Sequence, residues 1–369
     1  MRTERAVLVG VEIGREAPAL EELARLADTA GADTVATLTQ KRERPDPKYF
    51  IGSGKIEELK ALAAEHRANL AIFDHPLSPS QTRNIEDSSG LKVIDRTELI
   101  LDIFAQHARS REGKLQVELA QSTFLLTRLG GRGVMMSRLG GGIATRGPGE
   151  TRLEYDRRHI RAKICALKKQ IDKVRQERQV KRERRRQARI PTVALVGYTN
   201  SGKSTLLNAL TKAGVLTEDK LFATLDPTVR RLYLPSGRVV LLTDTVGFIQ
   251  KLPHQLVAAF QATLEEVSEA DLLLHVIDAA HQGYELQINA VYEVLEELHS
   301  IAKPLVSVFN KADQLEKKLS KKALAKYKPA VVISALRGEG LKELLATIDA
   351  QLPPPPTSVQ TSTAGTYPV

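Results

Sequence analysis

The first 110 residues alternate short apolar runs with longer runs in which apolar positions recur at helical spacing. The strand-like runs occupy residues 6–13, 33–39, 70–74 and 92–95. The helix-like runs occupy residues 20–31, 55–68, 79–89 and 96–108. Helices of this length can cross over between parallel strands, so the pattern predicts a small parallel sheet covered by helices.

A different pattern begins at Gly113, where two long helical runs follow each other. The first, residues 113–129, places four leucines on roughly one side. The second, about residues 151–188, has an apolar position every 4 or 3 residues, as in a narrow coiled-coil seam: Ile160, Ile164, Leu167, Ile171 and Val174. Two helices joined by one loop predict an antiparallel hairpin, with a glycine-rich loop at 130–150.

Strand and helix alternate again from residue 190 to residue 352. The later strand-like runs lie at 192–197, 229–244, 271–278, 304–310 and 330–335. The predicted fold class is therefore α/β, with a second, doubly wound and mostly parallel sheet. The predicted organisation is an N-terminal α/β domain at 1–112, a helical hairpin at 113–189, the second α/β domain at 190–352 and a Pro-rich, disordered tail at 353–369.

The positive charge of the chain is concentrated in one segment. The whole chain has a formal net charge of +10. Between Thr151 and Ile190, sixteen Lys and Arg less five Asp and Glu give +11, so the remainder is close to neutral. Such a segment favours a polyanionic partner over a merely solvated helix face. The glycine-rich loop is either a contact with RNA backbone or with the second α/β domain, or a disordered connector. The RNA-binding candidates are Arg132, Arg138, Arg146, Arg152, Lys181, Arg182, Arg184, Arg185 and Arg186.

The composition also indicates in which cellular compartment the protein is expected. There is no apolar run of about 18 residues that would span a membrane, and the N-terminus is too short and too acidic for a signal peptide. The one cysteine, Cys165, cannot form an intramolecular disulfide, and no Cys/His cluster has metal-ligand spacing. A reducing cytoplasm is the compartment that these features favour.

The stretch GYTNSGKS, Gly197 to Ser204, follows an apolar strand and opens a helix, which is the context that a phosphate loop requires. Backbone N–H groups at the start of a helix attract the β-phosphate. Lys203 would pair with the β and γ oxygens, and Ser204 would hold Mg²⁺. The similar IGSGKIEEL at 51–59 lacks the earlier glycine and has Ile56 after the lysine, so it predicts a loop and a helix start.

Two further segments complete a phosphate site. Asp244 ends the strand VVLLTD and is placed to bind magnesium through water, and Gly247 is placed to give its N–H to the γ-phosphate. Between them and the phosphate loop lies LFATLDPTVRR, in which Thr224 and Thr228 both qualify by position as the threonine that reaches Mg²⁺. The sequence of this segment does not indicate which of the two threonines binds Mg²⁺.

The motif NKAD, Asn310 to Asp313, predicts guanine as the base. The Asp313 carboxylate can accept from N1–H and from the exocyclic amine of guanine, whereas adenine offers neither donor there. The stem of Lys311 can cover the ring, and the loop at Ser334 and Ala335 can support O6 through a backbone N–H.

These motifs together, GYTNSGKS, FATLDPT, DTVGF, NKAD and ISA, resemble the HflX family of translational GTPases in the Obg-like branch. The resemblance extends through the glycine-rich stretch and the basic helix to about residue 352. It implies a cytosolic P-loop GTPase that uses Mg²⁺, converts GTP to GDP, binds the large (50S) ribosomal subunit and its rRNA, and helps to split stalled or idle 70S ribosomes. It also favours Thr224 for magnesium. Many members carry a further C-terminal domain, and this sequence continues only to Val369 after its proline run.

The resulting candidate residues fall into two sets. The predicted catalytic residues are Lys203, Asn200 and Gly247. The predicted GTP-binding residues are Gly197, Tyr198, Thr199, Asn200, Ser201, Gly202, Lys203, Ser204, Thr205, Phe222, Ala223, Thr224, Asp244, Thr245, Val246, Gly247, Asn310, Lys311, Asp313, Ser334 and Ala335.

Phe248 stands where a hydrolysing nucleotide switch usually has a glutamine that orients water. A phenyl ring can neither donate nor accept that hydrogen bond, so catalysis requires groups from elsewhere. Asn200 resembles an asparagine that helps to hold K⁺ in related GTPases. The ribosome is the other candidate source of a catalytic group. Two alternative functions are an RNA-remodelling enzyme that uses ATP at the N-terminal domain and a signalling GTPase with a protein partner. A monomer is expected.

Overall fold

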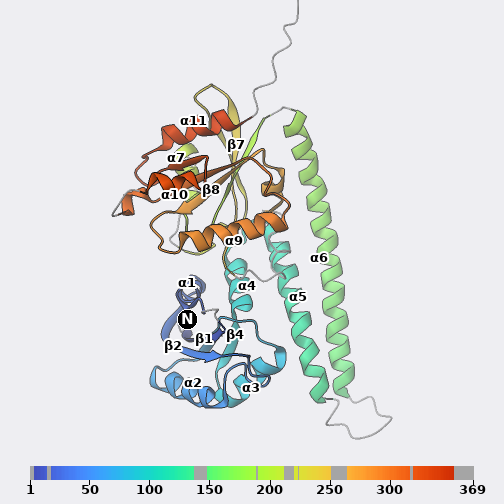
Figure 1. Ribbon diagram of the computed structural model, residues 1–369. Coiled ribbons are helices and arrows are strands. Elements are labelled where there is room, and N and C mark those ends of the chain that lie inside the picture. Colours follow the sequence, from blue (N-terminus) through green and yellow to red (C-terminus); the bar gives the residue numbers. More distant parts are fainter. Residues whose placement is uncertain are drawn as a thin grey trace, which may run out of the picture.

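The N-terminal domain is a parallel sheet covered by helices (Figure 1). The computed structural model describes residues 4–14, 18–136, 148–187, 190–211, 220–222, 224–250, 264–315 and 319–352, with the side chains of 130–136, 148–153, 181–182, 184–187, 321 and 323 left aside. The strands are β1 (Glu4–Ile13), β2 (Ala32–Arg42), β3 (Leu70–Phe73) and β4 (Lys92–Asp95), in the order β2-β1-β3-β4. The helices are α1 (Leu20–Ala30), α2 (Ser53–Glu65), α3 (Pro79–Ser89) and α4 (Arg96–His107). The predicted fold class is confirmed here.

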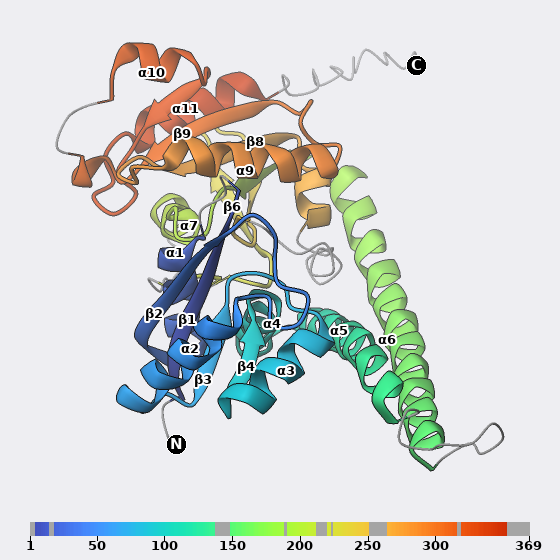
Figure 2. The same ribbon diagram turned by 60° about the horizontal axis from the view of Figure 1, so that its bottom comes forward.

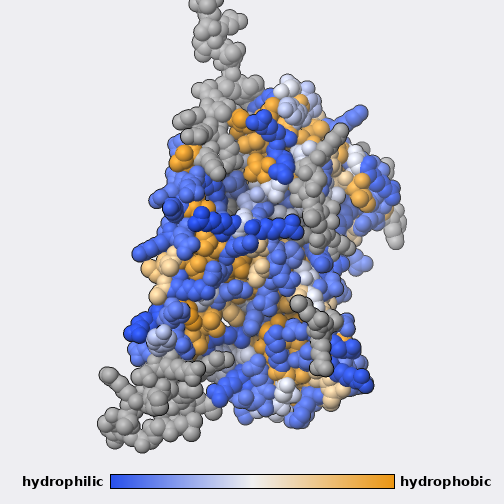
Figure 3. Space-filling model, turned by 180° about the vertical axis from the view of Figure 1, so that it is seen from behind, coloured by the Kyte–Doolittle hydropathy of each residue, from blue (hydrophilic) through white to orange (hydrophobic). Residues whose placement is uncertain are grey.

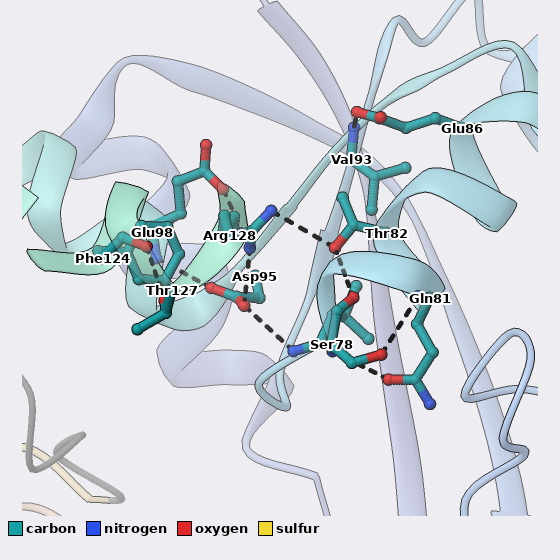
Figure 4. Close-up of polar contacts among 11 residues, drawn as sticks. Ser78, Gln81, Thr82, Glu86, Val93, Asp95, Glu98, Phe124, Thr127 and Arg128 are labelled. Carbon is teal, nitrogen blue, oxygen red and sulfur yellow. Dashed lines mark hydrogen bonds and ion pairs between the residues drawn. The ribbon is translucent and has the colours of Figure 1, made fainter. Parts of the chain in front are cut away.

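Local hydrogen bonds fix where these helices begin. Ser78 and Gln81 form a reciprocal capping box at the start of α3, and Asp95 accepts from the backbone N–H of Glu98 at 3.0 Å at the start of α4. The second oxygen of Asp95 accepts from Arg128, which reaches across from the helical hairpin at 3.0 Å (Figure 4). In α2, Gly52 stands at the N-cap, and its N–H donates to the side chain of Gln40 at 2.8 Å. The stretch at 51–59 is therefore a helix start, as its sequence predicts.

The helical hairpin consists of α5 (Arg111–Met136) and α6 (Pro148–Gln187), which lie antiparallel (Figure 1). Leu167 and Ile171 in the predicted seam are 4% and 5% exposed. The predicted loop at 130–150 was too long, because α5 continues through its first glycines and α6 begins at Pro148. Glycine propensity is a weak signal, and pairing of two long helices can override it.

The second α/β domain has a six-stranded sheet with the order β10-β9-β8-β5-β7-β6. Its strands are β5 (Thr192–Val196), β6 (Thr228–Tyr233), β7 (Val239–Asp244), β8 (Leu272–Asp278), β9 (Leu305–Asn310) and β10 (Ala330–Val332). All are parallel except β6, which pairs antiparallel with β7. The helices are α7 (Lys203–Thr211), α9 (Tyr284–Glu297), α10 (Lys321–Ala325) and α11 (Leu341–Gln351), with the short η1 (Ala312–Gln314) after β9.

The two α/β domains share one hydrophobic core. Leu221, Phe222 and Leu225 from the segment before β6, and Phe248 and Ile249 after β7, belong to the same buried cluster as residues of α1 and α4. The rings of Phe104 and Phe222 meet edge to face with centroids 4.8 Å apart. The N-terminal domain is therefore packed against the segments that flank the predicted phosphate site.

A polar cluster joins the domains beside that core. Arg96 is 2% exposed, pairs with Asp74 at 2.8 Å and with Glu22, and donates to the carbonyl of Gln250 at 3.1 Å. Glu22 also accepts from the hydroxyl of Tyr198, which in turn accepts from the N–H of Gln250 at 2.9 Å. Burial raises the pKa of Tyr198 to about 12, so the hydroxyl keeps its proton. The N–H and the carbonyl of Gln250 are thus both hydrogen-bonded.

Helix α6 runs along the molecule beside both α/β domains (Figure 2). Arg178 pairs with Glu112 of α5, and it also approaches Glu265 of the second α/β domain at 3.4 Å. The face seen in Figure 3 is mainly hydrophilic, with apolar side chains in scattered patches. Within the described part of the chain, none of the helices combines the length and the apolar character needed to cross a bilayer.

Candidate functional site

The phosphate loop connects β5 to α7 and depends on two glycines. Gly197 has φ 154° and Gly202 has φ 91°, in the region that favours glycine. A Cβ on Gly197 would lie 2.2 Å from the carbonyl oxygen of Val276, and one on Gly202 would lie 2.2 Å from Nδ2 of Asn310. The loop therefore packs directly on β8 and on the predicted base-binding motif.

Lys203 lies on the floor of this loop. It is 6% exposed, and its ammonium donates to the carbonyls of Tyr198 at 2.7 Å and Gly197 at 3.2 Å. Burial lowers its pKa to about 8, while the charge of Asp244 acts in the opposite direction. A phosphate would stabilise the charged form of this amine, so the position suits an anion.

Ser204, Thr224 and Asp244 converge beside the loop. The hydroxyl of Ser204 lies 2.8 Å from that of Thr224 and donates to Asp244 at 2.6 Å, and the Thr224 hydroxyl donates to Asp244 at 3.2 Å. Thr228 lies instead at the start of β6, opposite Asp244 in the antiparallel ladder. Of the two candidate threonines, Thr224 is the one in this hydroxyl and carboxylate cluster.

The cluster fits a hydrated magnesium ion. Burial raises the pKa of Asp244, and Lys203 and the two hydroxyl donors oppose that shift. The Oδ1 atom of Asp244 is buried and has no hydrogen-bond partner among the described residues. Hydroxyl and carboxylate oxygens are the ligands that Mg²⁺ prefers, with the remaining positions left to water and phosphate. Grouped His, Cys, Asp and Glu ligands of the kind that hold a metal without phosphate are not found in the described ranges.

A small cavity of about 50 Å³ lies over the loop. Its described lining consists of Lys220 and ten predicted site residues: Thr199, Asn200, Gly202, Lys203, Ser204, Thr205, Phe222, Thr224, Thr245 and Gly247. Sequence reasoning missed Lys220. The sequence shows a basic residue directly before LFATLDPT, but the motif alone does not indicate that this residue lines the cavity. Ala223 lies outside the described residues.

Gly247 closes the cavity on the β7 side. A Cβ there would lie 2.7 Å from Cα of Thr199 and 2.9 Å from the ammonium of Lys203. The next residue ties the two loops together, because the N–H of Thr199 donates to the carbonyl of Phe248 at 2.8 Å and the N–H of Phe248 donates to Gly197 at 3.0 Å. The phenyl ring of Phe248 is 3% exposed and packs in the shared core.

Three predicted GTP-binding residues make contacts within the protein. The side chain of Val246 is buried in the shared core, and that of Tyr198 points to Glu22 of the N-terminal domain. The carbonyl of Ser201 accepts from Asn310 at 2.9 Å. The side chains of Val246 and Tyr198 thus serve packing and domain contact, and the contact of these three residues with nucleotide stays a prediction.

The predicted base end is built around Asn310. Its Oδ1 accepts from the N–H of Ala335 at 2.9 Å, so that donor is engaged here and would be shared with guanine O6. Asp313 accepts from the hydroxyl of Ser334 at 2.6 Å, and this hydrogen bond is the main cause that lowers the Asp313 pKa. Lys311 adopts φ 63° and pairs with Asp278 at 2.6 Å. The Asp313 carboxylate is thus held ionised, as an acceptor.

The predicted RNA-binding residues are only partly described. Arg132 falls within α5, and Arg152, Lys181, Arg182, Arg184, Arg185 and Arg186 fall within α6. Their side chains, and Arg138 and Arg146 entirely, lie outside the described part, as does the predicted tail. Their contact with RNA stays a prediction.

Three family models match successive parts of the chain. They are described as GTP-binding GTPase N-terminal (residues 17–105), GTP-binding GTPase Middle Region (residues 107–185) and 50S ribosome-binding GTPase (residues 192–311). The three matches together cover most of the chain.

Curated relatives match over nearly the same length. The GTPase HflX of Caldanaerobacter subterraneus subsp. tengcongensis is 53% identical over 95% of this chain and 81% of its own, and that of Escherichia coli is 49% identical over 85% and 74%. A crystal structure of a GTP-binding protein from Sulfolobus solfataricus with GDP has a TM-score of 0.50 at 27% identity, covering 94% of this chain and 98% of its own. A structure of SsGBP and GDP has a TM-score of 0.54 at 28% identity, with the same coverage.

Proposed function

Since the chain belongs to the HflX family and is a GTPase, we propose that it binds the 50S ribosomal subunit in its GTP state and promotes splitting of stalled or idle 70S ribosomes. The observation that carries the proposal is the basic helix α6, which extends beside both α/β domains. Ribosomal RNA is a dense polyanion, and a segment with a net charge of +11 can neutralise several of its phosphates. The description of the model that matches residues 192–311 supports the same partner.

The nucleotide site is proposed to work through the residues that converge on the phosphate loop. Lys203 and the loop N–H groups bind the β and γ phosphates, Gly247 gives its N–H to the γ-phosphate, and Asp313 reads the base. Ser204 and Thr224, with Asp244 through water, would hold Mg²⁺, which would supply charge neutralisation to the phosphates. Asn200, which lines the cavity, is the proposed K⁺ residue; equal turnover in sodium and potassium salts would exclude that role.

The contacts between the domains support coupling of nucleotide state to RNA binding. Phe222 lines the phosphate cavity and Phe248 follows Gly247, which also lines it, and both phenylalanines pack in the core shared with α1 and α4. A change in either segment on loss of the γ-phosphate would disturb that core. The hairpin is fixed to the N-terminal domain through Arg128 and to the second α/β domain through Arg178. Hydrolysis is therefore proposed to release the protein from the subunit.

Changing Arg182, Arg184, Arg185 and Arg186 together to Ala is expected to weaken GTP-dependent binding to 50S subunits. Each lost phosphate contact removes about 0.7 to 0.9 from the slope of log affinity against log salt, so four contacts would reduce the slope by about 3. Co-sedimentation with 50S subunits over a salt series, with GTP or GDP, measures this.

A matched control removes four exposed positive charges from other elements: Lys60, Arg83, Lys322 and Lys342. The control is expected to retain most of the affinity and the slope. Equal binding by the arginine variant and the unaltered chain at low salt would remove α6 from the proposed interface. Binding that is the same with GTP and GDP would contradict the proposed switch.

A further inference from the structure

The cavity over the phosphate loop holds one cationic side chain that the motifs do not account for. Phe248 is buried in the shared core, so the switch segment after β7 offers no polar side chain at the position of the usual glutamine. Among the described residues that line the cavity, the positively charged ones are Lys203 and Lys220. Lys203 is on the floor of the loop, bonded to two loop carbonyls. Lys220 enters from the segment before β6.

The N-terminal domain holds the backbone next to Lys220. The N–H of Leu221 donates at 3.2 Å to the hydroxyl of Thr29 in α1, and that hydroxyl donates at 2.8 Å to the carbonyl of Arg25. Leu221 and Phe222 are 4% and 2% exposed, with Phe222 packed edge to face on Phe104 of α4. Two consecutive residues after Lys220 are thus anchored in another domain, whereas Lys220 itself is exposed.

We propose that Lys220 is a further catalytic residue for GTP hydrolysis, whose ammonium contacts the γ-phosphate while Thr29 and Phe104 anchor the two residues that follow it. Water attacks the γ-phosphorus, the bond from that phosphorus to the β–γ bridging oxygen breaks, and the proton of the water leaves with inorganic phosphate. The ammonium keeps its proton throughout. Its charge stabilises the negative charge on the γ oxygens and on the leaving GDP, which a preorganised cation does most effectively in a partly water-excluded site.

Arg25 is the competing supplier of positive charge. It lines a neighbouring cavity of about 350 Å³ between α1 and α9, together with Thr199 and Asn200 of the phosphate loop. Lys220 is favoured because it lines the same cavity as Lys203, Ser204 and Gly247, around which the phosphates would lie. Arg25 lines the adjacent space, and of the described residues Thr199 and Asn200 are the ones that line both cavities.

The test is single-turnover GTP hydrolysis by the full chain without ribosomes, so it does not depend on the proposed ribosomal function. Lys220→Ala and Lys220→Gln are expected to lower the rate by about 100-fold, the usual loss when one transition-state donor is removed. Lys220→Arg is expected to recover part of the rate, because it restores the charge. Thr29→Val is expected to lower the rate less, because it removes only the backbone anchor. Lys342→Ala, at an exposed lysine on α11, is the matched control.

Binding measurements separate catalysis from ground-state binding. GDP affinity is expected to change less than about threefold in Lys220→Ala, whereas affinity for GDP with aluminium fluoride falls in parallel with the rate. An unchanged rate in Lys220→Ala would overturn the proposal. So would a loss of GDP and GTP affinity with an unchanged rate constant at saturation, or a large loss of rate in Arg25→Ala with Lys220→Ala unaffected.

Discussion

Lys203→Ala is expected to abolish detectable GTP hydrolysis by the chain. The ammonium is buried and already oriented by the carbonyls of Gly197 and Tyr198, so it contributes to both nucleotide binding and the transition state without further ordering. Removing a preorganised donor to the reacting phosphate costs about 100- to 1,000-fold in rate, and the lost binding adds to that. Nothing else on the floor of the loop can take over this charge among the described residues.

The measurement is hydrolysis at saturating GTP together with GDP affinity. Lys60→Ala, at an exposed lysine on α2, removes the same charge away from the site and should leave both unchanged. Hydrolysis within about tenfold of the unaltered chain would mean that Lys203 does not contact the phosphates, since a direct contact is worth more.

Asp313→Asn is expected to exchange guanine for xanthine as the preferred base. The Asp313 carboxylate has its pKa lowered by the Ser334 hydroxyl, so it is an acceptor matched to the two donors of guanine. An amide presents one donor and one acceptor, which leaves an unpaired group against guanine at a cost of about 1–3 kcal/mol. Xanthine carries a carbonyl where guanine carries the amine, so it accepts from the new amide.

Affinities of GDP and XDP for the unaltered chain and the variant measure this exchange. GDP affinity should fall by about 10- to 100-fold, because each 1.4 kcal/mol is a factor of ten, and XDP affinity should rise. Asp87→Asn, at an exposed aspartate on α3, is the control and should preserve the preference for GDP. If Asp313→Asn still binds GDP as tightly as before, the base is not read at NKAD.

Most of the elements could be predicted because their signals are local. The four strands of the N-terminal sheet were placed within a few residues by their apolar runs, and the capping box at Ser78 marks the start of α3 within four residues of sequence. Helix lengths around glycines could not be predicted as well. Helix α5 continues up to Met136, through glycines that the sequence pattern assigned to the loop at 130–150.

In the candidate site, too, local features could be predicted from the sequence and long-range contacts could not. The phosphate loop follows from a contiguous motif, but the hydrogen-bonded cluster of Thr224 with Ser204 and Asp244 appears only when β7 and the preceding segment come together. The bond from Arg96 to the carbonyl of Gln250 joins residues 154 positions apart, and that from Leu221 to Thr29 joins residues 192 apart. No spacing rule predicts such contacts, because they depend on how two domains dock.

Phe248 illustrates what the fold adds. Its sequence position indicates that the usual water-orienting glutamine is replaced by phenylalanine. In the structure, the phenyl ring packs in the core shared by both α/β domains. The same switch segment continues to Gln250, whose backbone is held by Arg96 and Tyr198. A partner that moves the N-terminal domain would therefore also move the segments around the γ-phosphate.

The most direct test of the central claim is GTP hydrolysis by the full chain with and without 50S subunits, at equal magnesium and salt. A nucleotide switch controlled by arrival on rRNA predicts slow hydrolysis alone and a large stimulation by 50S subunits, at least about tenfold. That stimulation should be lost when salt weakens the phosphate contacts. A rate that 50S subunits leave unchanged, under conditions where the protein co-sediments with them, would contradict the account.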